Sequence, residues 1–336
     1  MTAERRRAKE EVAAASSSSP APQASEAQRR CAAAQRILVV GIGGGGDVAG
    51  ALACAEAARA LGTDAVVGGL TWERRPVDPL PGPRRLDEIS GATPLHAAVA
   101  LATPQTTGPG GFRFCEADMS AFLGEPVVLV DPTPGPAAVA AGLDAAAAHL
   151  ECDLVVLLDV GGDVLAHGHE PGLASPLADA TVLAAAPAMR TATLGVVFGI
   201  GCDGELTPAE VLERLDEVAA AGGDLGDLPL PAASLQRVEA ALEHVTTEAS
   251  AMAVRCARGE TGRAAIRGGR RTVPLTADGG RLVCFDPAVA IRSAARLALA
   301  VAGASSLEDA QQILTGLGVR TELDYERDAA AAQSAS

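Results

Sequence analysis

Continuous apolar runs alternate with alanine-rich segments along most of this chain, and this alternation limits the fold more than any other feature. The first run, Arg36–Gly41 (RILVVG), has no polar face, which is typical of a strand buried on both sides in a parallel sheet. Strands alternating with helices form right-handed βαβ units, so we expect a Rossmann-like α/β fold: a mostly parallel sheet with helices on both faces. Further strands are predicted at residues 64–71, 112–116, 126–131, 153–159 and 194–200.

The other segments complete this organisation. Residues 271–275 and 281–285 flank a turn and are expected to form a C-terminal β-hairpin. Residues 1–34 are rich in Arg, Ser and Pro without an apolar period, so we expect a disordered tail there and another at residues 329–336. A single α/β domain is then expected over residues 35–328. Helices are predicted at residues 93–103, 135–150, 232–258, 287–303 and 307–317, and one more begins at Thr207.

Lys9 is the only lysine among the 27 basic residues, and it lies in the expected N-terminal tail. A GxxxxGK[ST] phosphate loop and a pyridoxal Schiff base both need a lysine. The protein-kinase mechanism and the Tyr-x-x-x-Lys pair of short-chain dehydrogenases need one as well. The sequence therefore excludes these classes, and any bound anion must be held by arginine side chains or by backbone N–H groups.

Composition also limits the partners. The net charge is −15 and 2% of the residues are aromatic, which argues against a nucleic-acid partner, because phosphates need a basic face and single strands need stacking rings. No apolar run reaches the roughly 18 residues that a membrane-spanning helix needs. The seven cysteines are scattered without a CxxC pair, which fits the cytoplasm. We expect a cytoplasmic protein that binds a small molecule and binds neither nucleic acid nor membrane. The sequence leaves a homo-oligomer open.

A glycine-rich loop, GIGGGGD, follows the first strand at residues 41–47. In an open parallel sheet, ligands bind beyond the carboxyl ends of the strands, and glycines let backbone N–H groups approach an anion. Ligand-binding residues are therefore predicted at Gly43, Gly44, Gly45, Gly46 and Asp47.

The same loop matches the GxGxxG pattern of NAD(P)-binding proteins through Gly41, Gly43 and Gly46. Two features weigh against a dinucleotide. The acid expected to bind its ribose lies about 20 residues on in that pattern, whereas Glu73 lies further along and precedes two arginines. Asp47 would also repel a pyrophosphate unless a cation or an amine lay between them. NADP stays open because the arginines suit a 2′-phosphate, and so does a purely structural role for the glycines.

A second loop, residues 159–170, is richer in titratable side chains. Asp159 and Asp163 lie beside two glycines, and His167 and His169 follow them. Carboxylates beside imidazoles suit a divalent cation, so Asp159, Asp163 and His169 are candidate metal ligands. The four side chains are also candidate catalytic residues, with a histidine moving the proton because imidazole titrates near neutral pH. A polar cluster that binds substrate hydroxyls or an amine, and ordinary loop polarity, are the alternatives.

A third loop, residues 199–205, again combines glycines with carboxylates. Asp203 and Glu205 are predicted to bind the ligand because they follow a strand, as the other acids do. Cys202 precedes a predicted helix whose N-terminus would lower the pKa of its thiol. A nucleophilic role for this cysteine is therefore open, beside a purely structural one.

The proline-rich segment at residues 71–83 contains the only tryptophan of the chain. Trp72 and Glu73 are followed directly by Arg74 and Arg75. We predict that the arginines bind a phosphate or carboxylate while Trp72 stacks on a ring of the ligand, with Glu73 in the same site. The alternative is a rim that only covers the sheet.

Three runs of the chain resemble an uncharacterised family, a domain of unknown function that occurs in archaea and in GC-rich bacteria. The runs are RILVVGIGGGGDVAGAL, GGLTWERRPVDPLPGPRRLDEI and LLDVGGDVLAHGHEPGLASPLADA. The resemblance spans residues 35–325. It implies a ligand site built from these loops and supplies no catalytic residues.

These observations favour a non-redox enzyme, that is, a hydrolase, lyase, isomerase or transferase. Its expected substrate is a phosphorylated or carboxylated metabolite held by the glycine-rich loops and the acidic residues. An NAD(P)-dependent oxidoreductase is one alternative, and a non-catalytic ligand-binding or scaffold protein is another. The candidate cofactors are a divalent cation and NAD(P).

Overall fold

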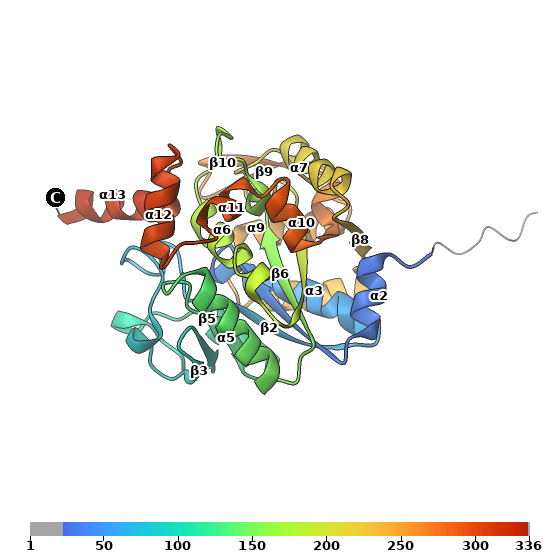
Figure 1. The fold of residues 1–336 in the computed structure, drawn as a ribbon, viewed down its shortest axis with the longest axis horizontal. Helices are drawn as coiled ribbons and strands as arrows, with labels where there is room; N and C mark the ends of the chain where they lie inside the picture. Colours follow the sequence, from blue (N-terminus) through green and yellow to red (C-terminus); the bar gives the residue numbers. More distant parts are fainter. Residues whose placement is uncertain (1–22, 335–336) are drawn as a thin grey trace, which may run out of the picture.

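The computed structural model of this chain describes residues 23–334 (Figure 1). Its centre is a nine-stranded sheet. The strands are β1 (Arg36–Gly41), β2 (Asp64–Leu70), β3 (Thr93–His96), β4 (Val99–Ala102), β5 (Val127–Val130), β6 (Leu154–Val160), β7 (Ala192–Phe198), β8 (Asp224–Leu228) and β11 (Leu282–Phe285). They lie in the order β3-β4-β5-β2-β1-β6-β7-β11-β8.

The centre of the sheet is parallel and its edges are antiparallel. Each neighbouring pair from β5 through β2, β1 and β6 to β7 is parallel. Strands β4 and β11 pair antiparallel with β5 and β7, and β3 and β8 extend the two edges. The chain runs from β1 outward to β2 and β5, then returns to β6 on the other side of β1. The ends of β1 and β6 therefore form a switch point, where ligands bind in open α/β sheets.

Helices cover both faces of this sheet, which confirms the α/β prediction (Figure 1). Along β1, Ile37 and Val39 pack into one hydrophobic core, whereas Leu38 and Val40 pack into the other. This alternation is the reason that the whole strand is apolar. The helices are α2 (Glu26–Ala33), α3 (Val48–Ala60), α4 (Cys115–Leu123), α5 (Pro136–His149), α6 (Pro176–Leu183), α7 (Pro208–Ala220), α8 (Ala232–Leu242), α9 (Glu248–Ala257), α10 (Pro287–Arg292), α11 (Arg296–Val301), α12 (Leu307–Gly316) and α13 (Glu322–Ser334).

Several local signals give the expected result. Thr207 caps α7 and forms a reciprocal capping box with Glu210, and Pro208 occupies the first turn. The predicted strands at residues 36–41, 64–71, 126–131, 153–159 and 194–200 correspond to β1, β2, β5, β6 and β7. No helix within residues 23–334 has both the length and the apolar character of a membrane span.

Two segments take the opposite secondary structure. Residues 93–103, predicted as a helix, contain β3 and β4 because Val99–Ala102 pairs with β5, and this pairing outweighs the helical preference of alanine and leucine. Residues 112–116, predicted as a strand, lead into α4 at Cys115. Phe112 and Phe114, the two aromatic residues of this segment, contact each other edge to face with their ring centres 4.9 Å apart.

The C-terminal hairpin is formed by other strands than those predicted. Its partners are β9 (Gly262–Ile266) and β10 (Arg271–Leu275), whereas residues 282–285 enter the main sheet as β11. The single helix predicted at residues 232–258 is two helices, α8 and α9, and residues 287–303 likewise form α10 and α11.

Parts of the expected tails are helical. Helix α2 occupies residues 26–33, where Ser25 and Gln28 form a capping box, and α13 continues to Ser334. The tail predictions for residues 26–33 and 329–334 are therefore wrong. The remaining tail predictions, for residues 1–22 and 335–336, lie outside the described residues.

Candidate functional site

The loops after β1 and β6 meet at the switch point of the sheet. Asp47 links them, because its Oδ2 accepts hydrogen bonds from the N–H groups of Gly43 (3.0 Å) and Val160 (3.3 Å). A Cβ on Gly41 would lie 2.5 Å from the backbone of Asp47, so this position has room only for glycine. The loop thus folds tightly around its own carboxylate.

An acidic cluster fills this end of the sheet. Each of its members is at most 9% exposed. Three loops, one strand end and one helix contribute: the turn after β1, the end of β6, the turn that follows β6, the loop after β7, and α6. The acidic cluster consists of Asp47, Asp159, Asp163, Asp179, Asp203 and Glu205. The structure therefore brings together the strand-end acids that the sequence singled out.

The cluster falls into two sets of three. In each set, one side-chain oxygen per residue lies within 4.8 Å of the others. The first set is Asp47, Asp159 and Asp179, and the second is Asp163, Asp203 and Glu205. Sequence reasoning missed Asp179, because this residue lies on α6 and only the tertiary fold carries it to the strand ends.

Hydrogen-bond donors are scarce around the first set. Asp159 Oδ2 accepts from the N–H of Gly162 at 2.7 Å. Its Oδ1 and the Oδ1 of Asp179 are buried and have no hydrogen-bond partner within residues 23–334. The second set is better supplied, since Glu205 accepts from the N–H groups of Ala174 and Ser175 at 2.7 Å and pairs with Arg267 at 3.2 Å.

This environment favours the neutral form of the carboxyl groups. Burial raises the pKa of Asp47 to about 7 and that of Asp203 to about 7. Burial and neighbouring acids raise the pKa values of Asp159, Asp163 and Asp179 well above the usual range of a carboxyl group. Packing several carboxylates together without enough donors is thus a cost to the folded state.

A buried pair of glutamates lies beside the glycine-rich loop. Glu73 Oε1 accepts from the N–H of Cys115 at 2.6 Å, and a Cβ on Gly45 would lie 2.4 Å from this same oxygen. Both carboxylate oxygens of Glu116 are buried and have no hydrogen-bond partner in the described part of the chain. Burial, followed by the nearby Glu73, raises the pKa of Glu116 well above its usual value. The sequence predicted Glu73 as a site residue but gave no signal for Glu116, which lies on α4.

Arg74 lies between the glycine-rich loop and α13. Its Nη2 donates to the carbonyl of Gly43 at 2.8 Å and lies 3.4 Å from the Glu322 carboxylate. Its guanidinium lies 4.4 Å from the centre of the Trp72 ring, which is 0% exposed. Trp72 also donates from Nε1 to Glu326 at 3.1 Å. Trp72 is thus a buried platform for Arg74, which corrects the prediction that it stacks on a ligand ring.

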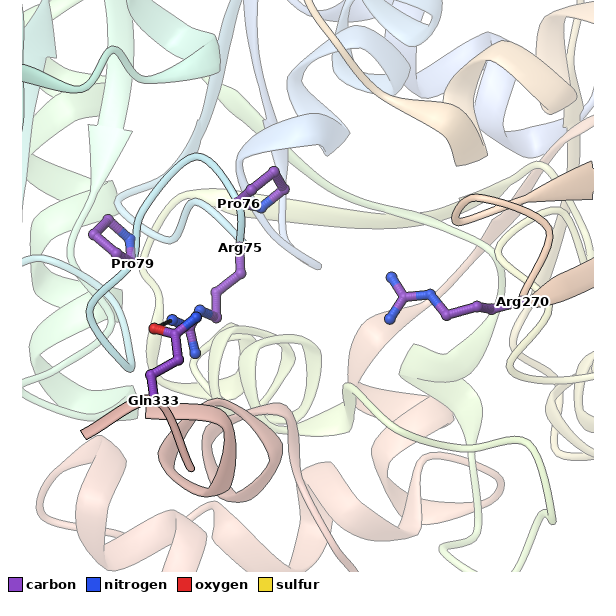
Figure 2. A pocket seen from close by; sticks show the side chains of 5 residues that line it. All are labelled: Arg75, Pro76, Pro79, Arg270 and Gln333. Carbon is purple, nitrogen blue, oxygen red and sulfur yellow. Dashed lines mark hydrogen bonds between the residues drawn. The ribbon is translucent and has the colours of Figure 1, made fainter. Parts of the chain in front are cut away.

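A pocket of about 400 Å³ opens beside these residues, and we call it the arginine pocket (Figure 2). It is lined by Arg75, Pro76, Pro79, Arg270 and Gln333. In Figure 2 the guanidinium of Arg270 points across the space toward the loop that carries Arg75. Arg75 donates to the Gln333 side chain through Nη2, while its buried Nη1 has no hydrogen-bond partner within residues 23–334.

Neighbouring arginines connect the arginine pocket to the acidic cluster. On one side, Arg74 contacts the glycine-rich loop. On the other side, Arg267 pairs with Glu205 at 3.2 Å, and Arg271 donates to the carbonyl of Gly204 at 2.7 Å. These two arginines flank Arg270 at the tip of the β9–β10 hairpin. The molecule therefore places a cationic pocket directly beside a buried anionic cluster.

The two loop histidines lie apart from this cluster. His167, His169 and Glu170 form a separate set, which excludes Asp159 and Asp163. His167 Nε2 lies 3.1 Å from the Glu217 carboxylate, and burial lowers the pKa of this histidine. The structure therefore does not assemble the predicted metal site of Asp159, Asp163 and His169, and Asp179 takes the place expected for the histidine.

Cys202 is buried against a second cysteine. Its Sγ lies 3.8 Å from the Sγ of Cys256. The hydrogen bond between the two thiols and burial raise the pKa of Cys202 far above its usual value. A thiol held in its neutral form is a poor nucleophile, so the structure favours the structural interpretation of this residue.

The N–H groups of the glycine-rich loop that a dinucleotide would need already donate hydrogen bonds within the protein. The N–H of Gly43 donates to Asp47, and the N–H of Gly45 donates to the carbonyl of Trp72 at 3.1 Å. A carboxylate thus occupies the position at which a pyrophosphate would accept hydrogen bonds. This geometry argues against NAD(P) at the GxGxxG pattern.

Comparison with known proteins identifies the family of the chain without indicating its chemistry. No curated protein and no solved structure matches it significantly. A family model, described as a protein of unknown function (DUF1152), matches residues 38–330. The resemblance seen in the sequence is therefore confirmed, and the chain belongs to the DUF1152 family of proteins of unknown function.

Proposed function

We propose that this chain is a cytoplasmic, non-redox enzyme that acts on a phosphorylated or carboxylated small molecule. The arginine pocket would hold the anionic group of the substrate, and the acidic cluster would hold the part that reacts. The observation that carries this proposal is that Arg74 and Arg271, which adjoin the two pocket arginines in the sequence, donate hydrogen bonds to the loops that carry the acidic cluster.

The arginine pocket has the properties of an anion site. Its volume of about 400 Å³ lies within the range usual for small-molecule sites. Nη1 of Arg75 is a buried hydrogen-bond donor that has no acceptor within residues 23–334. Arg270 supplies a second guanidinium from a different element. Two guanidinium groups can bind a phosphate or carboxylate through paired hydrogen bonds.

The acidic cluster supports a catalytic role rather than a structural one. A buried polar atom without a partner costs about 1–3 kcal/mol of stability. Asp159 and Asp179 both contain such atoms, and so does Glu116, which lies outside the cluster beside the glycine-rich loop. Groups that reduce stability at the carboxyl ends of parallel strands are typical of a functional site. The free cysteines of the described chain fit the reducing cytoplasm.

A thermal-shift screen of phosphorylated and carboxylated metabolites tests this proposal. A ligand at 100 times its Kd should stabilise the protein by about 2.7 kcal/mol. We expect Arg75→Ala and Arg270→Ala to weaken the binding of such a ligand at least tenfold. Arg263→Ala is the matched control, because Arg263 is an exposed arginine on the same hairpin and does not line the pocket.

Two results would contradict the proposal. Stabilisation by NADPH or NADP⁺ alone would favour an oxidoreductase instead. Equal affinity of the anionic ligand for the wild type and for both pocket variants would show that the arginine pocket is not its site.

A further inference from the structure

We infer that the acidic cluster binds a divalent cation of the magnesium class. Asp47, Asp159 and Asp179 would hold this ion. The inference deepens the proposed function and rests on it for the reaction that the cation would serve. Cation binding itself can be measured without any substrate.

The spacing of the oxygens fits this assignment. Mg²⁺ binds oxygen ligands at about 2.0–2.1 Å and Ca²⁺ at about 2.3–2.6 Å, so two ligands of one ion lie at most about 4.2 Å apart for Mg²⁺ and about 5.2 Å apart for Ca²⁺. Within the first set, the side-chain oxygens lie within 4.8 Å of one another. The first set therefore presents three ligand atoms that one ion can reach with small side-chain movements.

The unpartnered oxygens are an independent observation. Asp159 and Asp179 are each 1% exposed, and the Oδ1 atom of each has no hydrogen-bond partner within residues 23–334. Native proteins rarely leave buried carboxylate oxygens in this condition. A cation between these two atoms would satisfy both at once.

Protein cations do not neutralise the first set. Within residues 23–334, none of Asp47, Asp159 and Asp179 forms an ion pair with an arginine or a histidine within 4.0 Å. Arg74, whose charge acts on Asp47 and Asp179, donates to Gly43 and lies beside Glu322 instead of pairing with them. Buried charges are normally paired or bound to metal. A bound divalent cation supplies the charge that the chain lacks here.

The backbone makes room for the carboxylates of both sets. A Cβ on Gly43 would lie 2.8 Å from Asp47 Oδ2 and 3.1 Å from Asp179 Oδ1. A Cβ on Gly161 would lie 2.5 Å from the Asp203 carboxyl carbon, and the backbone there has φ +140°. Side chains at these two glycines would push the acids apart. The glycines are thus required by the acids around them as well as by the turns.

The ligand chemistry selects the class of cation. Both sets offer carboxylate oxygens without a thiolate or an imidazole. Hard oxygen ligands favour Mg²⁺, Mn²⁺ and Ca²⁺ over Zn²⁺ and Cu²⁺. A cation of this kind binds the oxygens of phosphorylated substrates, which agrees with the arginine pocket near the cluster.

Mn²⁺ titration of the EDTA-treated full chain, followed by isothermal calorimetry and by electron paramagnetic resonance, tests the inference. We expect one Mn²⁺ ion per chain, with competition by Mg²⁺. Asp159→Asn and Asp179→Asn should each remove this ion. Asp144→Asn is the control, because this buried aspartate lies outside the cluster and should keep the ion.

The outcomes separate the two proposals. No binding at about 10 mM Mn²⁺, or an ion retained by both Asp159→Asn and Asp179→Asn, would overturn the cation site. Circular dichroism of each variant shows whether loss of the ion reflects unfolding; for an unfolded variant, Asp159→Ser and Asp179→Ser repeat the test. A bound ion without affinity for any anionic metabolite would leave the inference standing and remove the proposed function.

Discussion

Asp144 and Asp159 are both buried aspartates, 6% and 1% exposed, but they lie at opposite ends of the sheet and have opposite surroundings. Asp144 accepts from the N–H groups of Arg190 and Thr191, from the Thr191 hydroxyl and from the Arg190 guanidinium, just before β7 begins. Asp159, at the end of β6, accepts from Gly162 and keeps one oxygen unpartnered within residues 23–334. Burial alone therefore does not distinguish these two carboxylates, but the supply of hydrogen-bond donors does.

The pKa values express the same difference. Burial would raise the pKa of Asp144, but the hydrogen bonds from Thr191 and Arg190 outweigh it and lower that pKa. Burial and the neighbouring Asp47 and Asp203 raise the pKa of Asp159. At the amino end of the strands a carboxylate stabilises the fold, whereas at the carboxyl end the fold tolerates carboxylates that destabilise it.

The largest expected effect is on stability. Asp144→Asn should lower the free energy of unfolding by about 1–2 kcal/mol, because a neutral amide oxygen replaces the charged acceptor of these hydrogen bonds and the amide NH₂ faces the Arg190 guanidinium. Without cations, Asp159→Asn should be neutral or stabilising by about 1 kcal/mol, since its amide oxygen can still accept from Gly162 and a repelling charge is removed. Urea unfolding in EDTA measures both. Equal losses in the two variants would remove the distinction between the two ends of the sheet.

The next effect is the pH dependence of the cation-free protein. The pKa values of Asp47 and Asp203 are about 7 in the folded state, whereas the usual value of an aspartate, which applies to the unfolded chain, is 3.8. Between these values the unfolded chain releases protons that the folded chain keeps, so stability should fall as pH rises. The slope is at most about 1.4 kcal/mol per pH unit for each group.

Asp144 acts in the other direction, because a lowered pKa makes its contribution to stability disappear as pH falls below the usual value of 3.8.

Because the pKa values of Asp47 and Asp203 are raised, the melting temperature in EDTA should decrease between pH 5 and pH 7 for the wild type and change less for Asp47→Asn. Saturating Mg²⁺ should reverse the wild-type slope. A stability that rises with pH in EDTA would contradict the charge balance described for the acidic cluster.

The smallest expected effect concerns His169. This exposed side chain belongs to the set with His167 and Glu170, away from the acidic cluster. We expect His169→Ala to change the Kd for Mn²⁺ less than twofold and the free energy of unfolding by less than about 0.5 kcal/mol. A tenfold loss of Mn²⁺ affinity, measured by calorimetry, would place this histidine among the cation ligands and restore the ligand set expected from the sequence.

Much of the fold follows from local rules. The apolar run of β1 needs burial on both faces. The strand ends in a glycine, Gly41, because a side chain there would clash with the backbone of Asp47. The rule that ligands bind at the carboxyl ends of parallel strands also predicted that Asp47, Asp159 and Asp203 would meet. Sequence reasoning succeeds here because each residue's position depends mainly on the strand before it.

The failures have a common physical cause. Asp179 and Glu116 lie on helices, and only the packing of α6 and α4 against the sheet carries them to the strand ends. Likewise, β4 forms because β5 is available to pair with it, whatever its own residues prefer. Trp72 was predicted to stack on a ligand because nothing in its neighbourhood indicates that Glu326 of α13, 254 residues later, binds it in the interior. Long-range contacts of this kind leave no local signal.

The pairing of β1 with β6 has a kinetic consequence. Asp47 accepts from the N–H of Val160, 113 residues further along the chain, so this contact forms only after a long loop has closed. Such contacts slow folding, because chain entropy is lost before the contact contributes. Here the closing step also brings like charges together. A divalent cation should therefore accelerate refolding, and its concentration during synthesis would help to set how quickly the newly made chain reaches its native state.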